Sequence, residues 1–339
     1  MKQTTDKLTV GLIGVANFGA YRRARMHESG NFTIAALCDR NAEVLAAASA
    51  EENARAYTDY AAMLEHPGLE GIVISTGADS HASLAIAAMR KGLHVFVEKP
   101  LCTSVEEVEA LRVATRETGR IFGMGHTDSS TDPLLNLAKS YIEEGRLGTV
   151  VSVEENSSHS GGLEIKKGDW RGLADRNPGG MLFQCGVHAL HGLIYLFGPI
   201  EGIQAMMSYE ANPNTETADA ANVLLRFKSG LVGTLNCYHV TAYCHELRIF
   251  GTKGNLYLDT HKKLAWFQPR KRNEIEERES VEVAPAPASH AYSNLDSWFN
   301  GIRKGTPVYP GLEDGIAAVL PVFAAESAAR DRHEVAAAQ

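Results

Sequence analysis

The first segment whose residue types and spacing suggest chemistry is residues 14–19, GVANFG. It follows an apolar run and precedes a helical one, which is the context of the G-x-G-x-x-G dinucleotide turn. Gly14 allows the tight turn, Gly19 allows close packing of helix on strand, and the helix N-terminus offers N–H groups to a pyrophosphate. Ala16 at the second glycine position weakens the match, since its methyl group stands where the phosphates approach. The predicted cofactor-binding residues of this turn are Gly14, Ala16, Asn17, Phe18 and Gly19.

An acidic residue stands where such a turn needs one. Asp39 comes twenty residues after Gly19, at the end of the second apolar run. A carboxylate there accepts hydrogen bonds from the ribose hydroxyls of NAD and repels a 2′-phosphate. Arg40 follows directly and is suited to binding that phosphate, so the sequence favours NAD and leaves NADP open.

The elements that position these residues alternate between strands and helices over the first 126 residues. Continuous apolar runs predict buried parallel strands at 8–13, 32–38, 71–75, 94–97 and 121–125. Ser104 and Glu107 form a capping box that opens a helix, which Gly119 can close. Right-handed crossovers then give a doubly wound parallel sheet. Thr76, just after the 71–75 strand, is predicted to lie against the cofactor.

In the second part of the chain, strands and helices no longer alternate. After a helix at 133–144, strands follow one another at 149–156, 202–209, 221–227, 231–240, 246–250 and 255–258. Residues 270–287 are predicted to be a loop with one edge strand, and 294–303 and 312–330 to be helices. The prediction is an α/β Rossmann domain, residues 1–127, followed by an α+β domain with a large, mostly antiparallel open sheet, residues 128–339.

Composition excludes several function classes. Lysine and arginine number 33 against 41 acidic residues, so the net charge is −8. That is the wrong sign for broad binding to nucleic acid or to an anionic membrane. Five cysteines without a CxxC pair suggest no disulfide framework, and neither a signal-peptide h-region nor a membrane-spanning apolar stretch is visible. We therefore expect a cytoplasmic protein with a small-molecule partner.

The run 94–100, HVFVEKP, completes a pattern that covers nearly the whole chain. The sequence resembles the Gfo/Idh/MocA family of sugar, inositol and related polyol oxidoreductases. The matching segments are the glycine-rich turn, Ser75-Thr76 with His81, Glu98-Lys99-Pro100, Gly125-His126 with Pro133, Gly145-Arg146-Leu147-Gly148, Asp169-Trp170-Arg171, Gly179-Gly180, Gly186-Val187-His188, Gly305-Thr306-Pro307 and Glu313-Asp314-Gly315. The resemblance implies hydride transfer between a carbinol carbon and nicotinamide, and a homodimer or homotetramer formed through the C-terminal sheet.

The resemblance also implies roles for individual residues. Lys99 would sit beside the reacting hydroxyl group, and His188 would act as general base. An imidazole can accept the hydroxyl proton at neutral pH, and an ammonium group can hydrogen-bond the developing oxygen. Further cofactor-binding residues are predicted to be His81, Glu98, Lys99, Trp170 and Arg171. The predicted substrate-binding residues are His126, His159, Gln184, His188 and Tyr238.

One position departs from the family pattern. Four residues before His188, where the family usually has aspartate, this chain has Gln184, and three residues after it stands His191. A glutamine cannot stabilise an imidazolium by charge, so His188 is expected to be a weaker base than in typical relatives. His188, His191 and Cys185 lack a carboxylate at ligand spacing, and no metal site is predicted.

Three functions therefore stay open. The first is an NAD(P)-dependent dehydrogenase acting on a sugar, cyclitol or sugar derivative. The second is an enzyme that holds NAD tightly through transient oxidation in glycoside cleavage or epimerisation, which Gln184 motivates. The third is a non-catalytic nucleotide-binding regulator that kept the fold.

Overall fold

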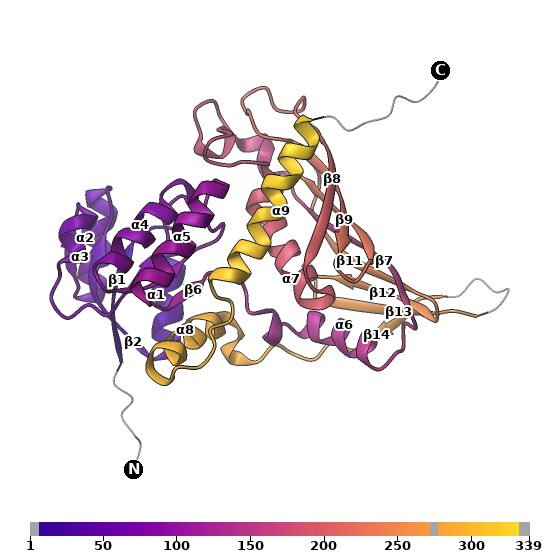
Figure 1. Cartoon of the computed structure of the whole chain (residues 1–339), viewed down its shortest axis with the longest axis horizontal. Coiled ribbons are helices and arrows are strands. Elements are labelled where there is room, and N and C mark those ends of the chain that lie inside the picture. Colours follow the sequence, from indigo (N-terminus) through magenta and orange to yellow (C-terminus); the bar gives the residue numbers. More distant parts are fainter. Residues whose placement is uncertain (1–6, 272–276, 332–339) are drawn as a thin grey trace, which may run out of the picture. The chain divides into compact units, whose positions relative to one another are not determined.

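A computed structural model describes residues 7–271 and 277–331 of the chain. The chain divides into two compact units (Figure 1). The first contains residues 1–128 and 288–316, and the second contains residues 129–287 and 317–339. Residues 1–6, to which the prediction of no signal peptide refers, lie outside the described residues.

The first unit contains a six-stranded parallel sheet, in the order β3-β2-β1-β4-β5-β6. The order starts at β1 and runs outward in both directions, so the sheet is doubly wound. Its central strands are buried along almost their whole length, as their continuous apolar runs predict. The strands are β1 (Leu8–Ile13), β2 (Phe32–Cys38), β3 (Arg55–Tyr57), β4 (Gly71–Ile74), β5 (His94–Val97) and β6 (Phe122–Met124).

The helix Val105–Thr118 of the first unit begins and ends at recognisable capping residues. The Ser104 hydroxyl accepts a hydrogen bond from the Glu107 N–H at 3.3 Å, and the Glu107 carboxylate accepts one from the Thr103 N–H at 2.8 Å. Gly119 ends the same helix in the left-handed conformation, as predicted. The helices are α1 (Phe18–Ser29), α2 (Ala42–Glu52), α3 (Tyr60–Leu64), α4 (Ala78–Arg90), α5 (Val105–Thr118) and α8 (Ser293–Lys304).

Helix α8 comes late in the sequence but packs on the first sheet. Trp298, fully buried, stacks on Phe32 with ring centroids 6.0 Å apart and lies 5.8 Å from the Phe96 ring. Together with α1 and α2 it closes the apolar core on one face of the sheet. The structural division therefore differs from the predicted domains 1–127 and 128–339, because residues 288–316 return to the first unit.

The second unit contains an eight-stranded sheet, in the order β14-β13-β12-β11-β7-β10-β9-β8. Neighbouring strands are antiparallel except for β10 and β7, which are parallel. The predicted α/β plus mostly antiparallel α+β fold is thus confirmed. The strands are β7 (Val150–Ser158), β8 (Ile200–Ser208), β9 (Ala220–Phe227), β10 (Val232–Tyr238), β11 (Cys244–Gly251), β12 (Gly254–Asp259), β13 (Leu264–Pro269) and β14 (Glu279–Val281).

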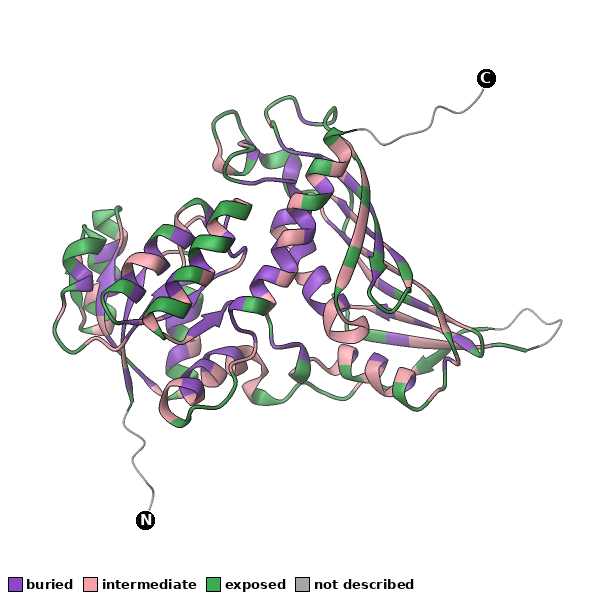
Figure 2. Cartoon of the chain, viewed as in Figure 1, coloured by how far each residue is buried: buried purple, intermediate pink, exposed green. Residues whose placement is uncertain are grey.

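Burial alternates along the strands of this sheet, most regularly in β9 (Figure 2). One face is therefore buried and the other is open. The helices of the unit are α6 (Pro133–Glu143), α7 (Val187–Phe197) and most of α9 (Leu312–Arg330). The short helical segments are η1 (Ser129–Thr131), η2 (Gly161–Glu164), η3 (Trp170–Gly172), the π-helical η4 (Leu182–Gly186) and, in the first unit, η5 (Ala288–Tyr292).

The sequence missed β3, α3 and β13, which are short or half-buried. It placed the edge strand of residues 270–287 correctly, since β14 ends the sheet. Among the described residues, no helix combines the length and the apolar character needed to cross a membrane.

Candidate functional site

The turn between β1 and α1 has the geometry that a dinucleotide needs. Gly14 has a φ of +83°, and a Cβ on it would lie 2.8 Å from the Ser75 carbonyl oxygen. A Cβ on Gly19 would lie 2.0 Å from the Gly14 carbonyl oxygen, so only glycine allows α1 to start this close to the strand. The Asn17 side chain makes no capping hydrogen bond, and the positive end of α1 faces the turn.

Asp39 is tied to this same turn. One carboxylate oxygen accepts a hydrogen bond from the Val15 N–H at 2.9 Å, and the other accepts one from the Asn41 N–H at 2.9 Å. Each oxygen keeps a second acceptor position for a ribose hydroxyl group. Arg40 is exposed at the following position.

Hydrogen bonds of Thr76 and His81 link the segments that follow β4 and β5. The Thr76 hydroxyl lies 2.7 Å from that of Ser80. The ring of His81 is buried between two carbonyl oxygens, with Nδ1 2.8 Å from that of Pro100 and Nε2 3.1 Å from that of Thr76. Burial lowers the pKa of His81. His81, predicted as a cofactor ligand, thus joins two backbone segments within the protein.

Glu98 and Lys99 follow β5 and have different surroundings. The Glu98 carboxylate is buried and forms an ion pair with the Arg22 guanidinium of α1. The Lys99 ammonium nitrogen lies 5.5 Å from the centroid of the Phe18 ring, which is 56% exposed. The lysine therefore stands beside the nucleotide turn, whereas the glutamate faces the protein interior.

His126, predicted to bind substrate, follows β6. It is buried, and its backbone carbonyl accepts a hydrogen bond from the Asn294 side chain at 2.7 Å. The loop after β6 is thereby fixed to the start of α8.

In the second unit, His159 is part of a group of aromatic rings. Its Nδ1 accepts a hydrogen bond from the Gly161 N–H at 2.9 Å, so a neutral ring carries its proton on Nε2, 3.7 Å from the Cys185 sulfur. The His159 ring centroid lies 5.1 Å from that of His239 and 5.7 Å from that of Tyr243. We call the group His159, His239, Tyr243, His245 and His261 the imidazole cluster.

The imidazole cluster disfavours positive charge. Burial, assisted by neighbouring His159, lowers the pKa of His239 to about 4, although Asp219 opposes this shift. Burial also lowers the pKa of His159, and burial with His261 and His159 nearby lowers that of His245. These rings are uncharged near pH 7 and present neutral donors and acceptors.

Gln184 and His188 lie where η4 meets α7. A Cβ on Gly186 would come within 2.7 Å of Leu182 and 3.0 Å of the Cys237 sulfur, so this glycine lets the segment approach β10. A regular helix would place residues 184, 188 and 191 on one face, whereas residues 182–186 are π-helical. Gln184 and His188 are half-buried, and His191 is buried.

Trp170 and Arg171 form η3 in the second unit. The Asp169 carboxylate caps it by accepting a hydrogen bond from the Arg171 N–H at 3.0 Å. The Arg171 guanidinium carbon lies 4.5 Å from the centre of the Trp170 ring.

Tyr238 lies on the other face of the sheet from the imidazole cluster. Its hydroxyl donates to the Asn222 side chain of β9 at 2.8 Å, on the open face. The neighbouring residue His239 is buried and reaches the cluster instead. The alternation Leu235, Cys237, His239 was the available signal for choosing His239, which the sequence-based set of substrate ligands omitted.

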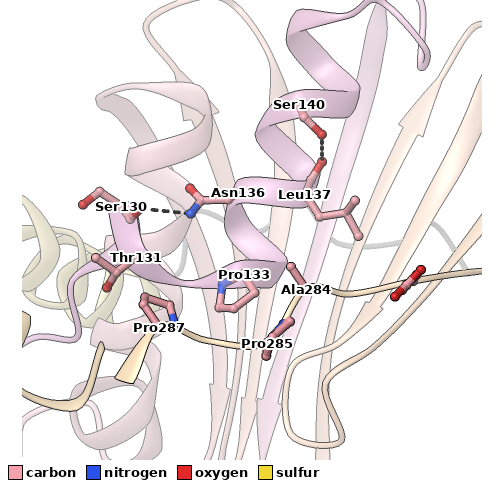
Figure 3. A pocket seen from close by; sticks show the side chains of 10 residues that line it. Ser130, Thr131, Pro133, Asn136, Leu137, Ser140, Ala284, Pro285 and Pro287 are labelled. Atoms are coloured by element: carbon pink, nitrogen blue, oxygen red, sulfur yellow. Dashed lines mark hydrogen bonds between the residues drawn. The ribbon is translucent and has the colours of Figure 1, made fainter. Parts of the chain in front are cut away.

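A separate hollow of about 400 Å³ lies between α6 and the segment that follows β14 (Figure 3). The Asn136 side chain donates a hydrogen bond to the Ser130 carbonyl at 2.9 Å, which is drawn as a dashed line in Figure 3, and Pro285 lies beside the helix. None of the predicted site residues lines this hollow. Its lining residues are Ser130, Thr131, Pro133, Asn136, Leu137, Ser140, Glu282, Ala284, Pro285 and Pro287.

Two family descriptions match this chain. Residues 8–126 match the oxidoreductase family with an NAD-binding Rossmann fold, and residues 135–257 match the GFO/IDH/MocA C-terminal domain. The chain belongs to the Gfo/Idh/MocA family of oxidoreductases. This confirms the resemblance, and it makes the chain an NAD-binding enzyme of the dehydrogenase type.

Among similar Gfo/Idh/MocA proteins, scyllo-inositol 2-dehydrogenase (NAD(+)) of Bacillus subtilis is 28% identical over 204 residues, 58% of this chain and 57% of that protein. Myo-inositol 2-dehydrogenase of Thermotoga maritima is 22% identical over 97% of this chain and 98% of that protein. The solved structure of levoglucosan dehydrogenase with NADH and levoglucosan shares the fold, with a TM-score of 0.83 and 21% identity over 96% and 98% of the two chains.

The nucleotide turn fits the cofactor of this family. A Cβ at Gly14 or Gly19 would collide with backbone atoms, so the two glycines let α1 start close to β1, and backbone N–H groups at the start of α1 are suited to the pyrophosphate. Asp39 keeps acceptor capacity for the ribose. Within residues 7–271 and 277–331, no group of three or more His, Cys, Asp or Glu side chains is arranged to hold a metal ion.

Proposed function

We propose that the protein is an NAD-dependent dehydrogenase that oxidises a carbinol carbon of a sugar, cyclitol or sugar derivative. The observation that carries the proposal is the position of Lys99, whose ammonium nitrogen lies 5.5 Å from the Phe18 ring of the nucleotide turn. This position next to the nucleotide turn supports a role for Lys99 at the reacting oxygen. The named activities of the two inositol dehydrogenases support the same substrate class.

The chemistry assigned to the protein concerns one oxygen and one proton. Bound NAD supplies the hydride acceptor. The Lys99 ammonium group hydrogen-bonds the substrate oxygen and stabilises the negative charge that develops on it. His188 takes up the hydroxyl proton as general base.

A polyhydroxy substrate suits the imidazole cluster. Neutral rings such as those of His239 and His245 each carry one hydrogen-bond donor and one acceptor, which matches hydroxyl groups. Tyr243 is 65% exposed and offers a ring face to the C–H face of a sugar. His126 and Gln184 are proposed as further hydroxyl ligands.

The test is a panel of polyols and sugars assayed with NAD, using the wild type and the variants Lys99→Met and His188→Asn. We expect kcat to fall by about 10²- to 10⁴-fold in each variant, which is the range for general acid–base groups. NAD affinity, measured by calorimetry, should change little in His188→Asn. Undiminished turnover in both variants would reject the assignment.

Gln184 favours a second candidate, an enzyme that keeps NAD bound while it cleaves or epimerises a glycoside. Such an enzyme would copurify with the dinucleotide and turn over substrate without net NADH formation. Stoichiometric NADH release would exclude it. A non-catalytic regulator would bind NAD and show neither reaction with any compound of the panel.

The open sheet face is the proposed contact for a homodimer or homotetramer. It carries exposed apolar side chains, among them Met206, Leu224 and Val232. The substitution Leu224→Lys should shift the protein towards the monomer in light scattering, and an unchanged mass would argue against this face. The five cysteines, all within the described residues, form no disulfide bond with one another, which supports the proposed cytoplasmic location.

A further inference from the structure

Arg22 is a buried cation that the sequence-based site does not include. It lies in α1, three residues after Gly19, and is 4% exposed. Its guanidinium carbon packs 5.0 Å from the centroid of the Phe96 ring. A charge is placed in such surroundings only where other groups compensate it.

The guanidinium group bonds to three separate segments. Its Nε pairs with the Glu98 carboxylate, its Nη2 donates to the Gly125 carbonyl at 3.0 Å, and its Nη1 donates to the Asn294 side chain at 3.3 Å. Asn294 in turn donates to the His126 carbonyl at 2.7 Å. The loop after β5, the loop after β6 and the start of α8 are therefore joined at one side chain.

We propose that Arg22 is the positioning residue for the active-site lysine, acting through Glu98, and for the loop that carries His126. The proposal rests on the proposed function, since it takes Lys99 as the group at the reacting oxygen. Arg22 itself touches neither substrate nor cofactor in this assignment.

Arg22 is connected to Lys99 through a single residue, Glu98. The Lys99 backbone N–H donates to the second oxygen of Glu98 at 3.2 Å, so any turn of the carboxylate moves this hydrogen bond. The two loops are also tightly packed, because a Cβ on Gly125 would lie 2.8 Å from Glu98 Cα. Without the guanidinium group, the buried Glu98 carboxylate loses its partner in the ion pair, and the loop must rearrange or the carboxylate must take up a proton.

The next residue in α1 provides a matched control. Arg23 is also buried, at 8% exposed, and bonds to the carboxylates of Glu51 at 2.7 Å and Glu52 at 2.8 Å. These partners lie in α2, a helix that carries none of the proposed site residues. Arg22 and Arg23 thus share residue type, helix and burial, and differ in whether their carboxylate adjoins Lys99.

The experiment compares Arg22→Gln, Arg22→Lys and Arg23→Gln in the full-length protein, with thermal midpoint, NAD affinity and steady-state kinetics on the same substrate. Arg22→Gln should lower kcat by about 100-fold, the loss expected for a misplaced catalytic group, with a change in NAD affinity of at most about threefold. Arg22→Lys keeps the charge but not the fork of donors, so kcat should fall by about tenfold. Arg23→Gln should lower the thermal midpoint and leave kcat within about twofold.

A further variant covers the case in which Arg22→Gln does not fold. The double substitution Arg22→Gln/Glu98→Gln removes both charges of this buried ion pair and should restore the thermal midpoint. If Arg22 positions Lys99, kcat stays at least about tenfold low although stability returns. Recovery of kcat together with stability would overturn the proposal, as would equal losses of kcat in Arg22→Gln and Arg23→Gln.

Comparing Lys99→Met with Arg22→Gln distinguishes a failure of the positioning role from a failure of the proposed function. If Lys99→Met retains full turnover, the role of the lysine is wrong. If Lys99→Met is inactive and Arg22→Gln is fully active, the lysine role stands and only the positioning role is rejected.

Discussion

The two units hold proposed site residues in opposite electrostatic settings. In the first unit, the segment around Lys99 is organised by a buried ion pair, Arg22 with Glu98, and by backbone N–H groups at a helix start. In the second unit, burial lowers the pKa values of His159 and His239, whose ring centroids lie 5.1 Å apart. An anionic dinucleotide needs charge and dipoles, whereas a polyol needs neutral donors and acceptors. The contrast supports the proposal that the first unit binds the dinucleotide and the second unit binds the polyol.

The largest effect is expected from a substitution that disrupts the nucleotide turn of the first unit. Gly19→Ala places a methyl group 2.0 Å from the Gly14 carbonyl oxygen, so α1 must move away from the turn. Overpacking of this kind costs about 1–3 kcal/mol, which corresponds to a loss of NAD affinity of up to about 100-fold. Calorimetric titration with NAD measures it. Gly192→Ala in α7, where a Cβ meets nothing closer than 3.5 Å, is the control and should bind NAD normally.

The second effect tests whether the imidazole cluster is held neutral. The pKa of His239 is about 4 in the folded protein because burial and His159 disfavour its charge, against about 6.5 in an unfolded chain. The unfolded chain therefore binds the proton first, and stability falls as the pH drops from about 6.5 to about 4, by about 3 kcal/mol at the end. Hydrogen exchange of peptides from β7 and β10 measures this loss of stability as the pH is lowered.

His239→Phe should remove that acid sensitivity while keeping the buried ring. His27→Gln, at an exposed histidine of the first unit, is the control and should leave the acid response of β7 and β10 unchanged. A His239→Phe variant that still loosens between pH 6.5 and 4 would contradict the assignment of this response to the cluster.

A third and smaller effect adds charge to the neutral region. Gln184→Asp restores a carboxylate four residues before His188, and an opposite charge within hydrogen-bonding range makes an imidazole a stronger base. If proton uptake limits the rate, kcat should rise by about tenfold at neutral pH. Gln184→Asn, which stays neutral, should not show the gain. A regulator without catalysis would respond to neither substitution.

Sequence patterns predicted the structural features that depend on residues close together in the chain. The run Leu8–Ile13, the glycines at 14 and 19 and the capping box at Ser104 depend on neighbouring residues alone, and the structure has each of them in place. The candidate residues Gly14, Asp39 and Lys99 were found because their motif lies at the end of a parallel strand.

What the sequence could not predict depends on distant partners. Helix α8 carries an apolar stripe, but nothing in that stripe says that Trp298 packs on the first sheet. Glu98 was predicted to bind cofactor, because its buried partner Arg22 is 76 residues away in the chain. The π-helical turn at Leu182–Gly186 also escaped a pattern search based on a regular helical period.

The smallest expected effect concerns the preference of the first unit for NAD over NADP. Arg40 is exposed beside Asp39. We expect it to attract the 2′-phosphate of NADP, whereas Asp39 is expected to bind the ribose of NAD. Arg40→Ala should weaken NADP binding by up to about fivefold, the range of an exposed ion pair, and leave NAD binding unchanged. Parallel titrations with both dinucleotides at low and high salt measure the difference, since screening should shrink it. Equal weakening of both cofactors would mean that Arg40 contacts a part of the molecule that NAD and NADP share.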